Sequence, residues 1–141
     1  MFVVKILTVG KCKDSYLLEG IAEYEKRLKP FATIQWIVAK TDKELAQLVS
    51  KESSYVCLDL SGKMYDSPTF SKTLLTMLEK EKSRATFVIG GFEGLDKDIV
   101  KKSLFSISLS PLTFTSQMVR LIFIEQLYRA FQIQQNKKYH R

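Results

Sequence analysis

Cysteine and histidine are scarce in this sequence of 141 residues, which contains two cysteines and one histidine. Cys12 and Cys57 belong to no CxxC motif and to no Cys/His cluster, so disulfide, redox and metal chemistry have no support. Free, reduced cysteines are typical of the cytosol. No apolar run reaches membrane-spanning length, and the start is too short and too charged for a signal peptide. We therefore expect a soluble, cytoplasmic protein that binds neither a membrane nor a metal.

The motifs of common catalytic sites are also missing. The sequence has no Ser/His/Asp set, no paired carboxylates and no P-loop. Its first strand-like run ends in the single Gly10, so the GxGxxG fingerprint of dinucleotide-binding proteins is absent. Any cofactor pocket must be built from another pattern.

The chain has enough apolar residues to form the core of one compact domain over residues 1–141. It also has an excess of positive charge. The formal net charge is +7. Residues 120–141 set five cations against Glu125, namely Arg120, Arg129, Lys137, Lys138 and Arg141. A basic end favours a phosphate-rich partner, although lysine-rich surfaces also simply keep proteins soluble.

Strand-length apolar runs alternate with helical patterns, which predicts an α/β fold with a mainly parallel sheet and flanking helices. The predicted strands are 3–9, 34–38, 55–60, 86–89 and 105–109, and Ser61-Gly62-Lys63 is expected to close the third. Four helices are predicted. Two of them cover 15–28 and 117–133. A third begins at a capping box formed by Thr41 and Glu44 and runs to 49, and a fourth begins with a cap and a first-turn proline at Ser67-Pro68 and runs to 78.

The last predicted helix is apolar around nearly its whole circumference, so it must be buried. In a small protein, burial against a second copy is economical, and we expect a homodimer through this helix. Arg120 lies on the apolar face and needs a partner. Two alternatives stay open for it, an ion pair, for example with Glu125 of the partner subunit, and a ligand.

The run Phe87–Gly94, FVIGGFEG, ends a predicted strand in glycines, which is where a parallel sheet brings its backbone close to a ligand. A tight turn is the plainer interpretation. Glu93 could bind a cationic group or cap the following helix. The hydroxyl-rich loop 108–116 could line the same pocket, with Leu112 and Phe114 as apolar walls, or could be an ordinary connection.

The tail 136–141 combines Tyr139, the single His140 and three cations. Aromatic and cationic side chains together suit base stacking and phosphate contact, whereas the alternative is a disordered terminus.

Four segments together closely resemble the RlmH family of SPOUT methyltransferases: IGGxEG within Phe87–Leu95, SLSxLT over Ser108–Thr113, EQLYRA over Glu125–Ala130, and the final Tyr139-His140-Arg141. The resemblance covers essentially the whole chain. It implies an enzyme that uses S-adenosylmethionine to methylate N3 of a pseudouridine in 23S, large-subunit, ribosomal RNA, on the assembled ribosome. It also implies a homodimer and a C-terminal segment that forms a deep trefoil knot, a rare exception to the rule against threaded loops.

Carried over position by position, the resemblance assigns two sets of residues. The cofactor pocket would be lined by Leu58, Gly90, Gly91, Ser110, Pro111, Leu112, Thr113, Phe114 and Thr115. The target base or RNA would be contacted by Tyr139, His140 and Arg141, with Arg129 in a supporting role. The resemblance implies no metal.

The chain departs from the family pattern at four positions. The family usually has proline and histidine where Thr115 and Ser116 stand, and proline where Phe92 and Lys138 stand. Ser116 is expected to cap the last helix in place of the histidine. These departures leave open a non-catalytic ribosome-binding or RNA-binding protein on the same fold. A flavodoxin-like nucleotide-binding module also fits the alternation of strands and helices, but it gives the terminal YHR no role.

Overall fold

A computed structural model describes residues 1–135, and its central element is a five-stranded parallel sheet. The strands are β1 (Phe2–Val9), β2 (Ala32–Ala39), β3 (Val56–Met64), β4 (Arg84–Ile89) and β5 (Ser106–Ser108). The helices are α1 (Ser15–Leu28), α2 (Asp42–Ser50), α3 (Ser67–Lys80), α4 (Lys97–Lys102) and α5 (Ser116–Gln134). The strands are ordered β2-β1-β4-β3-β5, and every pairing is parallel. The predicted α/β fold is confirmed.

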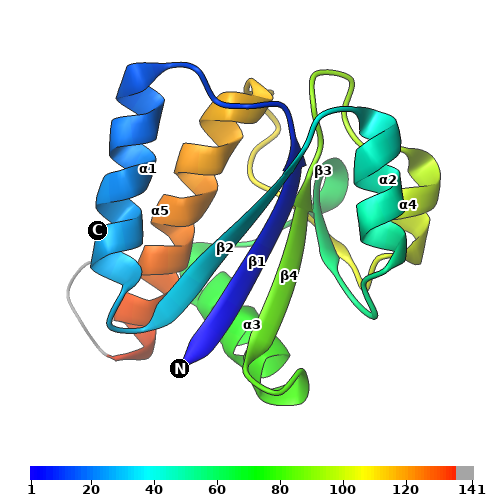
Figure 1. The fold of residues 1–141 in the computed structure, drawn as a ribbon. Helices are drawn as coiled ribbons and strands as arrows, with labels where there is room; N and C mark the ends of the chain where they lie inside the picture. Colours follow the sequence, from blue (N-terminus) through cyan, green and yellow to red (C-terminus); the bar gives the residue numbers. More distant parts are fainter. Residues whose placement is uncertain (136–141) are drawn as a thin grey trace.

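Helices cover both faces of the sheet (Figure 1). Alternate residues of β1 point to opposite faces. Val4 and Ile6 pack with α1, α3 and α5, and Leu7 packs with α2 and α4. On the first face, the ring of Phe123 lies 4.8 Å from that of Phe87 and 6.1 Å from that of Phe70, measured between centroids. This aromatic cluster fixes α5 and α3 against β4.

Helix α5 lies between α1 and α3 and completes the larger core. Its buried face carries Phe123, Ile124, Leu127, Ala130 and Phe131. The hydroxyl of Ser71 in α3 also donates a 2.7 Å hydrogen bond to the carbonyl oxygen of Ala130. Contacts within one protomer therefore account for a large part of the predicted burial of this helix. Met118, Ile122 and Ile133, on the other sides of the helix, are only partly buried.

The helix caps follow the sequence pattern at one position and depart from it at another. The hydroxyl of Thr41 accepts a 3.1 Å hydrogen bond from the amide of Glu44, as predicted. The prediction that Ser67 caps α3 is wrong. Asp66 holds the extended cap conformation instead, and its carboxylate accepts a 2.8 Å bond from the amide of Thr69.

Strand β3 continues past the position where it was expected to end. Ser61-Gly62-Lys63 does not close the strand, because Ile107 of β5 is in register with both Leu58 and Lys63, and the residues between them bulge. A Cβ atom at Gly62 would lie 2.5 Å from the carbonyl carbon of Ser106, so only glycine allows this approach. The short helix α4 was not predicted. Among residues 1–135, no helix has the length and apolarity needed to cross a membrane.

Candidate functional site

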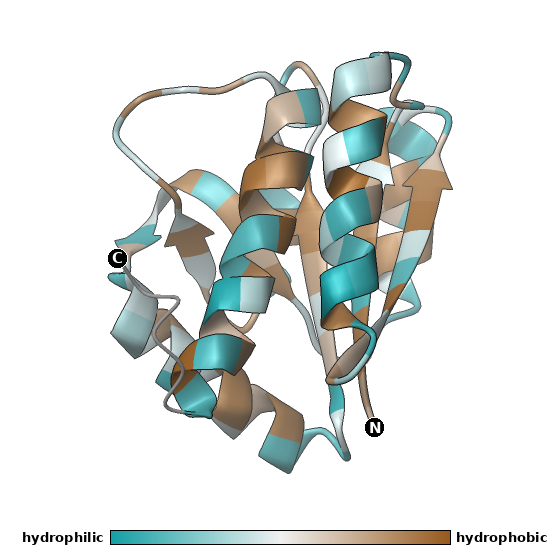
Figure 2. Ribbon diagram, turned by 90° about the vertical axis from the view of Figure 1, so that its left-hand side faces the viewer, coloured by the Kyte–Doolittle hydropathy of each residue, from teal (hydrophilic) through white to brown (hydrophobic). Residues whose placement is uncertain are grey.

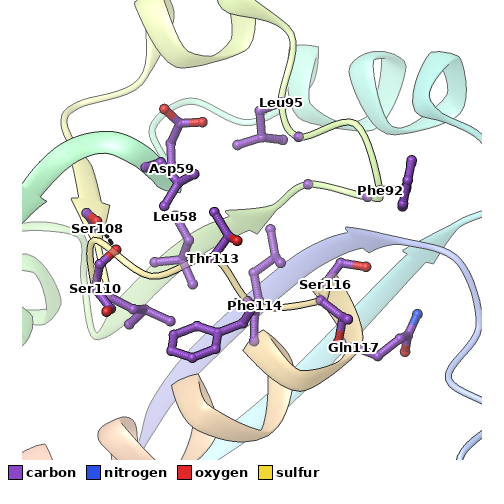
Figure 3. A pocket seen from close by; sticks show the side chains of 18 of the residues that line it. Leu58, Asp59, Phe92, Leu95, Ser108, Ser110, Thr113, Phe114, Ser116 and Gln117 are labelled. Carbon is purple, nitrogen blue, oxygen red and sulfur yellow. Dashed lines mark hydrogen bonds between the residues drawn. The ribbon is translucent and has the colours of Figure 1, made fainter.

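A cavity of about 830 Å³ lies where β3, β4 and β5 end at their carboxyl side (Figure 3). In open α/β sheets this edge is the usual place for a ligand. Three segments line the cavity: 58–60 within β3, 89–95 from the last residue of β4 onward, and residues between 107 and 119, from β5 to the start of α5. All the predicted cofactor-binding residues line it except Pro111, which is exposed.

The turn after β4 requires its glycines. A Cβ atom at Gly90 would lie 2.7 Å from the carbonyl carbon of Gly94, and Gly94 has a φ angle of 79°. The amide of Gly94 donates a 3.0 Å hydrogen bond to the carbonyl oxygen of Gly91, which closes the turn. The two interpretations of these glycines, a tight turn and a close approach to a ligand, are therefore compatible. The turn that they close also places the backbone of Gly90 and Gly91 in the wall of the cavity.

The loop after β5 is shaped by its own hydroxyl groups. Ser108 Oγ donates to the carbonyl oxygen of Ser110 at 3.1 Å, and Ser110 Oγ accepts from the amide of Leu112 at 3.0 Å. Thr115 caps α5 by accepting a 3.2 Å bond from the amide of Met118. The expectation that Ser116 is the cap is wrong, because Ser116 is already the first helical residue.

The lining suits a ligand that is part apolar and part polar. Leu58, Ile89 and Ile107 supply buried apolar walls. Asp59 supplies a carboxylate, which accepts a hydrogen bond from the amide of Ser61 at 3.1 Å. Gln117 also lines the cavity, and its buried Oε1 has no hydrogen-bond partner among the described residues.

An S-adenosylmethionine molecule matches this donor and acceptor set. The cavity volume is in the range for a small organic cofactor, and the glycine backbone that lines it suits an adenosine group. An amino group finds acceptors in Asp59 and Gln117. Sequence reasoning missed both residues. Asp59 directly follows the buried strand residue Leu58, a signal that could have found it, whereas Gln117 joins the site only through the placement of α5.

Arg120 contacts the backbone of its own chain. Its guanidinium is buried and donates from Nη2 to the carbonyl oxygens of Val9 and Gly10, each at 2.6 Å. Burial lowers the pKa of this guanidinium. Glu125 of the same chain binds Arg129 of the same helix, with 2.9 Å between Nη2 and Oε2. Arg120 therefore fastens α5 to the end of β1.

Two other predicted residues differ in their position relative to the cavity. Arg129 is on α5 and does not line the cavity. Glu93 lines the cavity mouth but does not cap α4, because Asp96 accepts the capping bond from the amide of Asp98 at 3.0 Å. The tail residues Tyr139, His140 and Arg141 lie outside the described residues. Within residues 1–135, His, Cys, Asp and Glu side chains form no group of three that could hold a metal ion.

The chain is similar to known methyltransferases in sequence and in fold. A family model described as predicted SPOUT methyltransferase matches residues 2–140. A protein of Protochlamydia amoebophila (strain UWE25) named ribosomal RNA large subunit methyltransferase H is 43% identical over 141 residues, which is 100% of both chains.

Two solved structures share the fold. A methylase family protein from Haemophilus influenzae Rd KW20 aligns with a TM-score of 0.60 at 13% identity, over 98% of this chain and 70% of that one. The methyltransferase Lpg2936 of Legionella pneumophila, solved with bound SAM, aligns with a TM-score of 0.51 at 8% identity, over 92% of this chain and 66% of that one.

Proposed function

The chain belongs to the SPOUT methyltransferase family, whose knotted α/β fold it has, and from that premise we propose that it methylates N3 of a pseudouridine in large-subunit ribosomal RNA. S-adenosylmethionine is the methyl donor of this family. The observation that carries the proposal is the cavity at the ends of β3, β4 and β5. It is lined by nearly all the residues to which the family resemblance assigns cofactor binding. The substrate is the assembled large subunit or ribosome.

The cofactor is held, in this proposal, by the residues that line the cavity. The backbone of Gly90 and Gly91 and the loop 110–115 surround it, and Leu58 forms an apolar wall. Asp59 and Gln117 bind its amino groups. When bound, the cofactor supplies an electrophilic methyl group on a sulfonium ion.

The remaining catalytic work falls to the protein's own side chains. N3 of pseudouridine carries an imide proton, which must leave before or during attack on the methyl group. The protein must align N3 with the methyl group and favour the deprotonated imide. We assign Tyr139, His140 and Arg141 to the target base and the RNA around it, with Arg129 in support. Either His140 accepts the proton or a nearby cation stabilises the developing anion.

We further propose that the protein acts as a homodimer through α1 and α5, each protomer being one domain over residues 1–141. The two helices lie side by side on one surface, and apolar residues lie along α5 there (Figure 2). Tyr16 and Leu18 of α1 are exposed, and Ile122 of α5 is only partly buried. A second copy would cover these side chains. Multi-angle light scattering at micromolar concentration checks this proposal, and a monomer mass would refute it.

Labelling of ribosomes tests the proposed reaction. Purified protein is incubated with labelled S-adenosylmethionine and ribosomes from a strain that lacks this methylation, and the label is mapped by nuclease digestion and mass spectrometry. We expect label on one pseudouridine of the large-subunit RNA. Because the substrate is the ribosome, we also place the protein in the cytoplasm.

The same assay distinguishes the proposed enzyme from the alternative, a non-catalytic ribosome-binding protein on the same fold. Ribosome binding without label and without cofactor binding in calorimetry would favour that alternative. It would also make Ser116, which replaces the family's usual histidine at the cavity, the first residue to restore.

A further inference from the structure

Phe92 is the most exposed large apolar residue among those described, with a relative accessibility of 101%. It is also one of the residues that line the cavity, at the end that carries Ser116 and Gln117 and away from Ser108 and Ser110 (Figure 3). A phenyl ring left entirely in water forgoes the stabilisation that burial would give it. Its position at the mouth of a binding cavity suggests that a ligand covers it.

The backbone around Phe92 holds the ring outward. Gly91 and Gly94 on either side form an isolated antiparallel bridge, and the amide of Gly94 donates a 3.0 Å bond to the carbonyl oxygen of Gly91. Gly90 packs with its α-carbon against the backbone of Gly94, so the turn cannot tighten further. The backbone that carries the ring is therefore already fixed in a turn, so little backbone entropy is lost when the ring contacts a ligand.

Two further apolar side chains flank the same cavity from the loop after β5. Leu112 is 71% exposed and Phe114 is 40% exposed, and both line the cavity. The mouth thus carries two aromatic rings and one aliphatic side chain, set around a site with few charged groups. A flat, apolar surface of this kind suits a planar ring system.

We propose that Phe92 is a substrate-positioning residue that stacks on an unpaired nucleobase of the RNA, next to the base that is methylated. This inference rests on the proposed function. Aromatic side chains bind splayed-out bases of single-stranded RNA through their π-faces, and the contact tolerates any base. The formal net charge of +7 favours RNA as a partner of the whole chain, whereas the charged side chains that line this cavity are the carboxylates of Asp59 and Glu93, so the contact at Phe92 is to a base and not to a phosphate. The proline usual at this position in the family has no aromatic ring, so the stack is a property of this chain.

Binding of large ribosomal subunits to three variants tests the proposal. Phe92→Ala removes the ring, Phe92→Leu keeps an apolar side chain without a flat face, and Leu104→Ala is the matched control. Leu104 is 56% exposed and lies before the amino end of β5, whereas the cavity lies at the carboxyl end of that strand. Circular dichroism and thermal unfolding establish that each variant is folded.

We expect the dissociation constant for large subunits to rise about tenfold in Phe92→Ala and nearly as much in Phe92→Leu, the size of one lost base stack. Leu104→Ala should bind as the wild type does. In turnover, KM for large subunits should rise while kcat and the calorimetric affinity for S-adenosylmethionine stay unchanged. The binding assay does not depend on methyl transfer, so failure of the proposed reaction and failure of this stack are distinguishable.

Three results would overturn the proposal. Unchanged affinity of Phe92→Ala for large subunits would show that no base stacks there. A loss confined to cofactor affinity would assign the ring to the cofactor. A change in the mass measured by light scattering, without a change in RNA affinity, would assign it to a second copy of the chain.

Discussion

Arg120 donates a 2.6 Å hydrogen bond to the carbonyl oxygen of Gly10, a residue 110 positions earlier in the chain. The same Nη2 atom donates to the carbonyl oxygen of Val9 at 2.6 Å. Gly10 has a φ angle of 86°, and its α-carbon faces the side chain of Gln117. One buried cation therefore joins the end of β1 to the start of α5, one turn from the lining of the cavity.

Removing this cation should destabilise the protein. In Arg120→Met the two carbonyl oxygens lose their donor in a buried place, so we expect the free energy of unfolding to fall by about 2–4 kcal/mol. Arg120→Lys keeps the charge but not the planar geometry, and should lie between the methionine variant and the wild type. Urea unfolding followed by circular dichroism measures all three. Equal stability of Arg120→Met and wild type would contradict the importance of this link.

The two adjacent glycines after β4 should respond differently to alanine. In Gly90→Ala the new methyl group meets the backbone of Gly94 at 2.7 Å, whereas in Gly91→Ala its nearest neighbour is a side-chain atom of Val9 at 3.4 Å. We expect a loss of about 2 kcal/mol for Gly90→Ala and of less than about 1 kcal/mol for Gly91→Ala. Thermal unfolding compares them. Calorimetry with S-adenosylmethionine should also show weakened binding by Gly90→Ala, and the prediction fails if that variant binds as the wild type does.

Deleting Tyr139, His140 and Arg141 should abolish methyl transfer and leave cofactor binding intact. The reason is that, in the proposed mechanism, the cavity binds the cofactor and the tail contacts the RNA. Labelled methyl transfer to ribosomes and calorimetry with S-adenosylmethionine measure the two properties separately. Lys137→Ala with Lys138→Ala is the control, since it removes tail charge but keeps the three residues. Unchanged turnover by the truncated protein would refute the assignment.

Stability should fall at alkaline pH because of Cys57. Burial raises the pKa of its thiol from 9.0 to about 11, so the folded state holds the proton more tightly than the unfolded state. This contribution is complete below pH 9 and is lost as the pH rises to about 11, amounting to about 2–3 kcal/mol. Burial also raises the pKa of Tyr55, whose hydroxyl donates a 2.6 Å bond to the carbonyl oxygen of Ile99, and this acts in the same direction.

Urea unfolding at a series of pH values between 8 and 11 measures the effect. Cys57→Ala serves as the control, because it lacks the thiol and should lose less stability over this interval. A parallel decline in the variant and the wild type would assign the alkaline effect to other groups.

The sheet could be predicted because each strand carries a local apolar run and each long helix a local periodicity. The extension of β3 could not, because Ser61-Gly62-Lys63 has the composition of a turn, and only pairing with Ile107, more than forty positions later, draws it into the strand. The capping of α3 differed by one position, since Asp66 and Ser67 are both good caps. Helix α4 is too short to show a period.

The site was predictable in its loops but not in its details. The family motifs selected Leu58 in β3 and the loops after β4 and β5, and these segments line one cavity. Residue spacing could not give the partners of Arg120, because two backbone carbonyls at the far end of the chain have no sequence signature. Gln117 was missed for the same reason, as its role depends on where α5 meets β1.

The position of α5 has a consequence for the way the protein is made. This helix supplies Phe123, Ile124, Leu127 and Phe131 to the larger core, yet it follows every other described element along the chain. The nascent polypeptide emerges from its amino end, so β1 and its neighbours leave the exit tunnel with one face uncovered. The larger core can therefore close only after α5 has left the tunnel, and a chaperone that shields this face until then would raise the yield of native protein.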